Sequence, residues 1–168
     1  MINPHKTKYF PLYWSMVEAA AAQSVATRHK VGAIVVTPTG MLSVGWNGTP
    51  AGMDNNCESH LVEEDENNPG KLRWKTNPVT LHAERNAIDK MTRQGVPTQG
   101  SVLFVSRAPC FECAKALHGL GLKAVFYLEE HDDMSGVEML QKLGIKVEHH
   151  FVQTIYQELN TYYQRGPV

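Results

Sequence analysis

The chain has 168 residues, of which 42% are apolar and 20% charged, so it is long enough for a full hydrophobic core and unlike a disordered polymer. No apolar run approaches the roughly 20 residues of a membrane-spanning helix, and the N-terminal residues lack the apolar core of a signal peptide. A formal net charge of −1 favours a small ligand over DNA or RNA, whose partners usually carry a basic face. Three cysteines leave no disulfide framework, and we therefore expect a cytoplasmic protein.

The first half of the chain predicts a helix, a hairpin and a long loop. Residues 11–28 carry apolar side chains at helical spacing, with alanines in the interior. Residues 31–37 are rich in β-branched side chains, and after a Pro-Thr-Gly turn residues 41–46 return as a second strand. Glycines, prolines and an acidic run interrupt residues 47–80, where we expect a loop insertion over about 53–80 with at most a short helix. A loop of this length in a compact domain is usually functional.

The second half alternates between helices and strands. We predict helices over residues 82–93, 109–118, 135–143 and 151–163, with Thr80 as the N-cap of the first and Pro109 opening the second. Strands are predicted over 102–106, 124–128 and 145–149. This alternation predicts an α/β fold in one domain over residues 1–168, with helices covering a central sheet.

Two short motifs carry the chemistry. His82-Ala83-Glu84 precedes Pro109-Cys110-Phe111-Glu112-Cys113, and both lie at the start of a predicted helix. One imidazole and two thiolates can hold zinc while leaving its fourth tetrahedral position open for water. The metal lowers the pKa of that water towards neutrality, and Glu84 is placed to move protons beside it. Because Cys110 and Cys113 are three residues apart, both project from one face of a helical turn.

Each motif alone has other interpretations. A His-x-Glu pair on a helix is usually a surface pair, and Cys-x-x-Cys can be a redox pair, half of a structural zinc site or two buried thiols. A structural site needs a fourth protein ligand, and the only other cysteine is Cys57. The two motifs together favour an open, catalytic zinc site.

The chain resembles the zinc-dependent cytidine deaminase superfamily, and within it the deoxycytidylate (dCMP) deaminases, including phage members. Five segments, in order along most of the chain, carry the resemblance: residues 31–33 (VGA), 45–52 (GWNGTPAG), 82–88 (HAERNAI), 109–115 (PCFECAK) and 121–125 (GLKAV). Trp46 replaces the more usual tyrosine, and His131 stands where relatives often have tyrosine. The resemblance implies a three-layer α/β/α sandwich around a mixed five-stranded sheet. It also implies a cytoplasmic enzyme, in the host cytoplasm if a phage encodes it.

The resemblance further implies hydrolytic deamination of dCMP to dUMP and ammonia, which supplies dUMP for thymidylate synthesis. His82, Cys110 and Cys113 would bind the zinc ion, and Glu84 would carry protons to N3 of cytosine and to the departing amine. The residues expected to contact the substrate are Asn47, Ala83, Ala108 and His131. The 5′-phosphate needs a cation, and of Arg28, Lys30, Arg73 and Lys75 we favour Arg28, which stands just before the Val31-Gly32-Ala33 segment.

Regulation is a further implication of the resemblance. Many dCMP deaminases are homo-oligomers activated by dCTP and inhibited by dTTP, with Mg²⁺ accompanying the triphosphate. A hexamer or trimer is therefore expected, with a candidate effector site at Gly48, Pro50, Gly52 and Arg93. Cys57 and His60 offer too few ligands for a second zinc ion, and we expect Cys57 to be a free thiol.

Two other functions use parts of the same pattern. Zinc chemistry of this type also deaminates tRNA adenosine, free cytidine or guanine, although the small net charge and the 45–52 segment count against tRNA. A non-catalytic binding protein stabilised by zinc is the other alternative. The acid at Glu84 counts against it, because a structural metal does not require a proton carrier.

Overall fold

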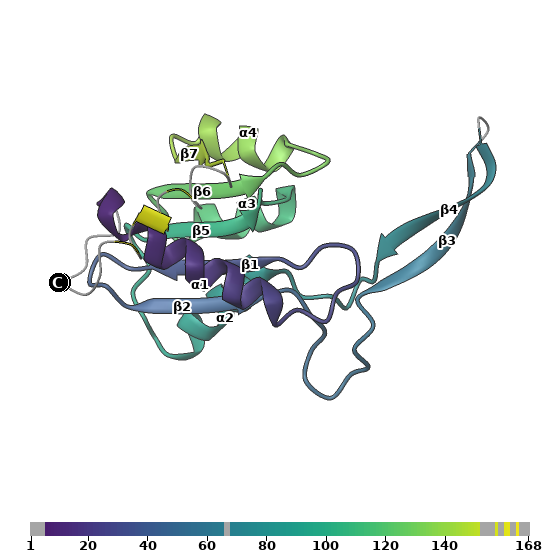
Figure 1. The fold of residues 1–168 in the computed structure, drawn as a ribbon, viewed down its shortest axis with the longest axis horizontal. Helices are drawn as coiled ribbons and strands as arrows, with labels where there is room; N and C mark the ends of the chain where they lie inside the picture. The colour runs from purple at the N-terminus through teal and green to yellow at the C-terminus, as the bar shows by residue number, and fades with distance from the viewer. Residues whose placement is uncertain (1–5, 66–67, 152–156, 158–159, 162–163, 165–168) are drawn as a thin grey trace.

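The computed structural model describes residues 6–65, 68–151, 157, 160, 161 and 164, and side chains are described outside residues 60–73. Its centre is a five-stranded sheet in the order β2-β1-β5-β6-β7 (Figure 1). The strands span Gly32–Val36 (β1), Leu42–Trp46 (β2), Val102–Arg107 (β5), Ala124–Glu129 (β6) and Lys146–His149 (β7). β1 runs antiparallel to both β2 and β5, whereas β5, β6 and β7 are parallel. The predicted mixed sheet is confirmed.

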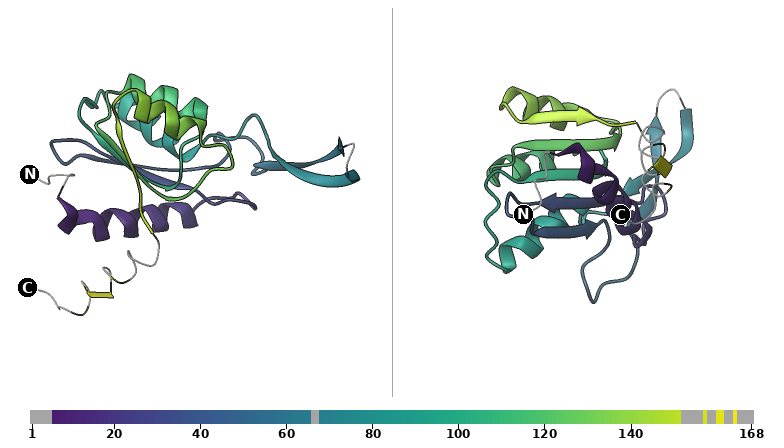
Figure 2. Two further views of the ribbon diagram at one scale, coloured as in Figure 1. Left: turned by 90° about the horizontal axis from the view of Figure 1, so that it is seen from above. Right: turned by 60° about the vertical axis from the view of Figure 1, so that its left-hand side comes forward.

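Helices cover both faces of this sheet, as predicted (Figure 2). A short 3₁₀ helix, η1 (Thr7–Tyr9), leads into α1 (Phe10–Ala22), which lies on one face. On the other face lie α2 (Ala83–Arg93), α3 (Phe111–Gly119) and α4 (Ser135–Lys142). None of the helices within the described residues is long and apolar enough to cross a bilayer. The helix predicted over residues 151–163 falls almost entirely outside the residues that the structure describes.

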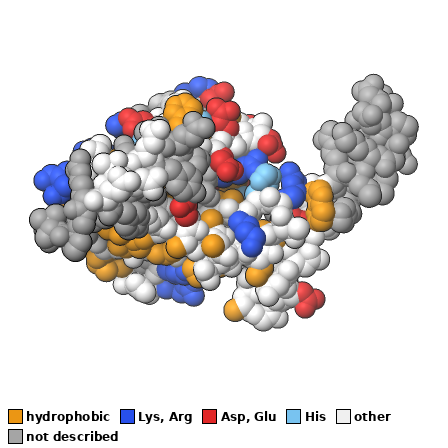
Figure 3. All heavy atoms as spheres, in the orientation of Figure 1, with side chains coloured by type: hydrophobic (Ala, Val, Ile, Leu, Met, Phe, Trp, Pro, Cys, Tyr) orange, Lys and Arg blue, Asp and Glu red, His pale blue; other side chains and the backbone are white. Residues whose placement is uncertain are grey.

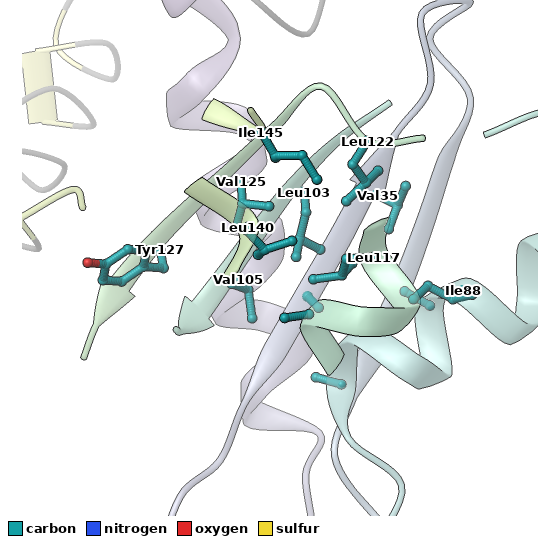
Figure 4. Close-up of a cluster of buried hydrophobic side chains, with 14 of the residues drawn as sticks. Val35, Ile88, Leu103, Val105, Leu117, Leu122, Val125, Tyr127, Leu140 and Ile145 are labelled. Carbon is teal, nitrogen blue, oxygen red and sulfur yellow. The ribbon is translucent and has the colours of Figure 1, made fainter. Parts of the chain in front are cut away.

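Strand alternation divides the core into two clusters. Side chains at Ile34, Phe104 and Phe126 point towards α1, where Tyr13 and Trp14 are fully buried against them. The intervening residues of the same strands point to the opposite face and pack on α2, α3 and α4; Figure 4 labels Val35, Leu103, Val105, Val125 and Tyr127 among them, with Ile88, Leu117 and Leu140 from the helices. Because successive strand residues face opposite sides, β1, β5 and β6 are buried on both faces and read as continuous apolar runs.

The segment predicted as a loop contains a β-hairpin instead. β3 (Glu58–Asp65) and β4 (Asn68–Thr76) pair antiparallel and form a separate two-stranded sheet. Figures 1 and 2 show this hairpin extending away from the central sheet as an arm. The prediction of a loop was wrong because the glycine, the prolines and the acidic run of this segment interrupt the alternating apolar pattern by which strands are recognised.

Three predicted helix boundaries also differ. The first helix ends at Ala22, and residues 23–31 form a connection in which Ser24 Oγ donates a hydrogen bond of 2.9 Å to the Asn47 carbonyl. Thr80 is not the N-cap of α2: its Oγ1 donates to the Cys57 carbonyl at 3.0 Å, and His82 occupies the N-cap position. The helix predicted from Pro109 begins at Phe111.

Side chains of α2 close the outer edge of β2. Lys90 Nζ lies 2.6 Å from the Val44 carbonyl oxygen and 4.6 Å from the centre of the Trp46 ring. One turn earlier, Asn86 Nδ2 donates a 3.0 Å hydrogen bond to the Trp46 carbonyl. Two edge carbonyls are therefore bonded to side chains of a neighbouring helix.

Candidate active site

The two sequence motifs meet where α2 and α3 begin. His82 is the N-cap of α2 and Cys110 the N-cap of α3, while Cys113 lies in the first turn of α3. His82 Nδ1 is 3.4 Å from both sulfur atoms, and the three ligand atoms all lie within 4.8 Å of one another. Bond lengths of about 2.0–2.3 Å to a tetrahedral zinc ion require ligand separations of roughly 3.5–3.8 Å. The residues fit a zinc ion with three protein ligands and one open position.

The hydrogen bonds within this cluster favour a thiolate at Cys110. A hydrogen bond from the Cys113 thiol lowers the pKa of Cys110 to about 3. A weaker effect of the same sign comes from the hydrogen bond with His82. The same contact with Cys110 raises the pKa of His82 and that of Cys113. A thiolate is the form in which cysteine binds metals. The cluster therefore holds one ligand in its binding form even before a metal enters.

Glu84 is a buried carboxyl group beside the cluster. It lies in the first turn of α2, and the residue is 4% exposed. Burial raises the pKa of Glu84 to about 7, because the charged form loses its hydration. A carboxyl group with a pKa near neutrality can both accept and donate a proton under physiological conditions.

The zinc-ligand cluster and Glu84 open into one pocket. It is lined by the following residues: Arg28, His29, Val31, Asn47, Glu58, Thr76, Thr80, His82, Ala83, Glu84, Arg107, Ala108, Cys110 and His131. Figure 3 shows Lys or Arg and His side chains gathered with acidic ones on the body of the protein beside the base of the hairpin. The structure thus brings together, from five separate segments, all five residues predicted to contact a substrate.

Asn47 is tied to the backbone of the pocket wall. Its Oδ1 accepts a hydrogen bond of 2.8 Å from the Val31 N–H, and its Nδ2 donates one of 2.8 Å to the His29 carbonyl. The side chain therefore fixes the course of residues 29–31, and it retains one further donor and acceptor for a ligand.

The other predicted substrate contacts have distinct surroundings. Ala83 and Ala108 are buried, and because the Ala108 N–H donates to the Glu129 carbonyl at 2.7 Å, the Ala108 carbonyl is the group available to a ligand. His131 Nδ1 lies 3.1 Å from the backbone N and O of Asp133. Arg28 Nη1 donates to the Trp74 carbonyl at 2.8 Å.

The other residues considered for the phosphate and for a second metal site have different positions. Lys30 and Lys75 are exposed and do not line it. The side chains of Arg73 and His60 lie outside the described part of the structure. Cys57 is a buried free thiol that joins no described cluster of metal-ligating side chains. Burial raises its pKa, which makes the thiol unreactive.

The proposed effector residues lie outside the pocket. Gly48 forms a two-way backbone pair with Leu81, and Pro50 and Gly52 follow in the connection towards β3. Arg93 is exposed in the last turn of α2, where its Nε donates to the Asp89 carbonyl at 3.3 Å.

Sequence reasoning missed several polar residues of the pocket, among them Glu58, Thr76 and Arg107. The Glu58 carboxylate accepts hydrogen bonds of 3.0–3.2 Å from the backbone of Thr27 and Arg28, and so joins the hairpin to the pocket wall. Arg107 ends the buried strand β5. A charged residue between an apolar strand and a Cys-x-x-Cys turn is the one signal that could have identified it.

Comparison with known proteins agrees with this geometry. The family described as the cytidine and deoxycytidylate deaminase zinc-binding region matches residues 11–129. Deoxycytidylate deaminase of Mycobacterium phage D29 is 32% identical over 132 residues, which cover 77% of this chain and 99% of the relative. ComE operon protein 2 of Bacillus subtilis is 33% identical over 130 residues, and the match covers 76% of this chain and 64% of that protein.

A solved structure is also similar over most of its length. The crystal structure of dCMP deaminase from the cyanophage S-TIM5 in complex with dCMP and dUMP is 38% identical, with a TM-score of 0.74, and the match covers 86% of this chain and 98% of that one. The family match spans all three candidate zinc ligands and Glu84. The chain belongs to the zinc-binding cytidine and deoxycytidylate deaminase family.

Proposed function

We propose that this protein hydrolyses dCMP to dUMP and ammonia at a zinc ion held by His82, Cys110 and Cys113. The observation that carries this proposal is that these three ligands and the buried Glu84 carboxyl group line or adjoin one pocket. The cyanophage relative, whose complex contains dCMP and dUMP, supports the choice of nucleotide. The product would supply dUMP for thymidylate synthesis.

Glu84 is the proposed proton carrier. When bound, the zinc ion supplies Lewis acidity that makes water nucleophilic near neutral pH. Glu84 would accept a proton from the attacking water and deliver it to N3 of the cytosine ring while the hydroxyl adds to C4. It would then take the proton of this C4 hydroxyl group and deliver it to the amino group, so that the C4–N bond breaks and the carbonyl of the product forms. The balance is one water consumed and one ammonia released. A pKa raised to about 7 by burial suits a group that must accept and return protons.

We assign the substrate contacts to the pocket wall. The Ala108 carbonyl would accept a hydrogen bond from the exocyclic amine, and the buried backbone at Ala83 would face the attacked ring. Asn47 and His131 would contact the sugar or base, and Arg28 would neutralise part of the phosphate charge. These assignments follow the resemblance and are supported by the common pocket.

We further propose regulation by dCTP as activator and dTTP as inhibitor, with Mg²⁺ on the triphosphate, in a cytoplasmic hexamer or trimer. Gly48, Pro50, Gly52 and Arg93 remain the candidate effector residues. The basis is the resemblance to regulated dCMP deaminases. Initial rates against dCMP, with and without each effector and Mg²⁺, test it; superimposable curves would remove this part of the proposal.

Ammonia release from zinc-loaded protein, over a panel of dCMP, CMP, deoxycytidine, cytidine, dCTP, adenosine and guanine, tests the reaction and its substrate. We expect the highest kcat/KM for dCMP. A higher value for another substrate would assign the pocket to that substrate. Ammonia from none of them, at full zinc content, would favour a non-catalytic zinc protein.

A further inference from the structure

Arg107 is a charged side chain buried in the wall of the active-site pocket. The residue is 9% exposed although it carries a guanidinium group. Its Nη2 lies 2.9 Å from Asp132 Oδ1, and the Asp132 side chain is 77% exposed. Arg107 Nε is buried and has no hydrogen-bond partner within the described part of the chain. A buried cation is thus balanced by one carboxylate that remains largely in water.

This environment is incomplete for a guanidinium group. Arginine offers five N–H donors in a planar fork, and the described residues accept from only one of them. A buried charge without full pairing is costly, so its presence in a pocket wall indicates a bound anion. The fork matches the oxygens of a phosphate group better than any single carboxylate can.

A second guanidinium group lies on the same part of the pocket. Arg28 lines the pocket, and its exposed side chain is held by the Trp74 carbonyl at 2.8 Å. Burial lowers the pKa of His29, and the positive charges of Arg107 and then Arg28 lower it further. Both cations therefore act on the one imidazole of His29, which lines the same pocket.

We propose that Arg107 binds the phosphate of a nucleoside monophosphate, with Arg28 as the second cation and Asp132 fixing the guanidinium group. This inference rests on the proposed function, to which it adds the residue that distinguishes a nucleotide from a nucleoside. A phosphate monoester carries about −1.5 to −2 charges at pH 7, which two guanidinium groups neutralise. An unphosphorylated nucleoside would leave the buried Arg107 Nε without an acceptor, and sites of this kind discriminate strongly.

The test compares dCMP with deoxycytidine in zinc-loaded protein carrying Arg107→Gln. We expect kcat/KM for dCMP to fall roughly 10- to 100-fold, mainly through KM, because a hydrogen bond to a charged group is lost. The preference for dCMP over deoxycytidine should fall by a similar factor. Arg85→Gln is the matched control, because Arg85 is 55% exposed and pairs with Asp89 at 2.8 Å on the surface of α2. It should keep the preference of the wild type.

The outcomes separate the two proposals. An equal loss with both substrates, or an unchanged preference for dCMP, would overturn the role of Arg107 and leave the deaminase function standing. A wild type that prefers deoxycytidine or deaminates neither would instead overturn the proposed function.

If Arg107→Gln does not fold, Asp132→Asn decides the matter, since its side chain is mostly exposed. Asparagine keeps an oxygen that can accept the hydrogen bond from Arg107 and so still fixes the guanidinium group, but it removes a negative charge beside the phosphate. The preference for dCMP should therefore rise roughly two- to fivefold. An unchanged or lower preference would overturn the proposal.

Discussion

Glu84 combines a buried carboxyl group with a helix N-terminus. The first turn of α2 favours its negative charge through the helix dipole, whereas burial at 4% exposure opposes that charge. Burial prevails, and the pKa rises to about 7. The ionised and the protonated forms of Glu84 are therefore close in free energy near neutral pH.

Replacing Glu84 with glutamine removes the ionisable group and keeps the size of the side chain. Glu84→Gln should lower kcat for dCMP by roughly 10²- to 10⁴-fold, because the amide cannot carry protons. Zinc content, measured by elemental analysis, should stay at the wild-type level, because Glu84 is not a ligand. Glu112→Gln is the control: Glu112 is an exposed partner of Lys115 on α3, and its loss should leave kcat unchanged. Retained activity in Glu84→Gln would refute the proposed mechanism.

Residues recognised from the sequence are those whose chemistry depends on local spacing. Cys110 and Cys113 share a helical turn, and His82 with Glu84 share another, so four side chains could be assigned before the fold was known. Arg107 was missed: its position after an apolar strand was its one local signal, and its burial arises from the packing of β5 and the approach of Asp132 from a distant segment. A lone arginine in a sequence is usually at the surface.

The helix α4 packs directly on the turn that carries the first cysteine ligand. A Cβ atom at Gly136 would lie 2.7 Å from the Cys110 carbonyl carbon and 2.8 Å from its oxygen. The adjacent backbone therefore leaves no room for a side chain here. Gly136 allows the start of α4 to support the metal-binding turn.

Gly136→Ala should consequently separate α4 from this turn. We expect a loss of about 1–3 kcal/mol in the free energy of unfolding, as overpacking costs in tight sites, together with weaker zinc binding. Urea denaturation and competition with a zinc chelator measure the two effects. Gly119→Ala is the matched control, because Gly119 ends α3 and a Cβ atom there meets nothing within 4 Å. Equal stability of the two variants would contradict the packing argument.

Elements that pack in the two core clusters were predictable, and the hairpin that extends away from the central sheet was not. β1, β5 and β6 and the helices that pack on them were expected near their observed positions, because burial imposes apolar runs and helical periodicity. The hairpin of β3 and β4 stands apart from the sheet (Figure 1) and gave no such signal. The start of α2 also differs from the predicted boundary, because Thr80 bonds to the Cys57 carbonyl and does not cap this helix.

The protein as a whole consists of a body and an arm. Within the residues whose burial is described, both core clusters are built from the central sheet and its helices, with no contribution from the hairpin. The base of the hairpin nevertheless supplies Glu58 and Thr76 to the pocket. The pocket should therefore depend on the base of the arm, whereas the stability of the body should not depend on its tip.

Shortening the arm tests this division. Leu61 and Arg73 are paired residues, so residues 62–72 can be replaced by an Asn-Gly turn that keeps the pairs at the base. The free energy of unfolding should change by less than about 1 kcal/mol, and dCMP deamination should persist because the Glu58 and Thr76 pair is intact. Thermal denaturation and ammonia release provide the measurements. A chain that fails to fold would show that the arm stabilises the body.

The capped edge of β2 limits how copies of this chain can associate. An open sheet edge presents free carbonyl and N–H groups on which another strand can pair, which is a common start of aggregation. Here Lys90 and Asn86 already occupy the carbonyls of Val44 and Trp46. A second copy would have to displace a cation and an amide before its strand could join the sheet. Pairing of a further strand is thereby disfavoured at these two carbonyls of the β2 edge.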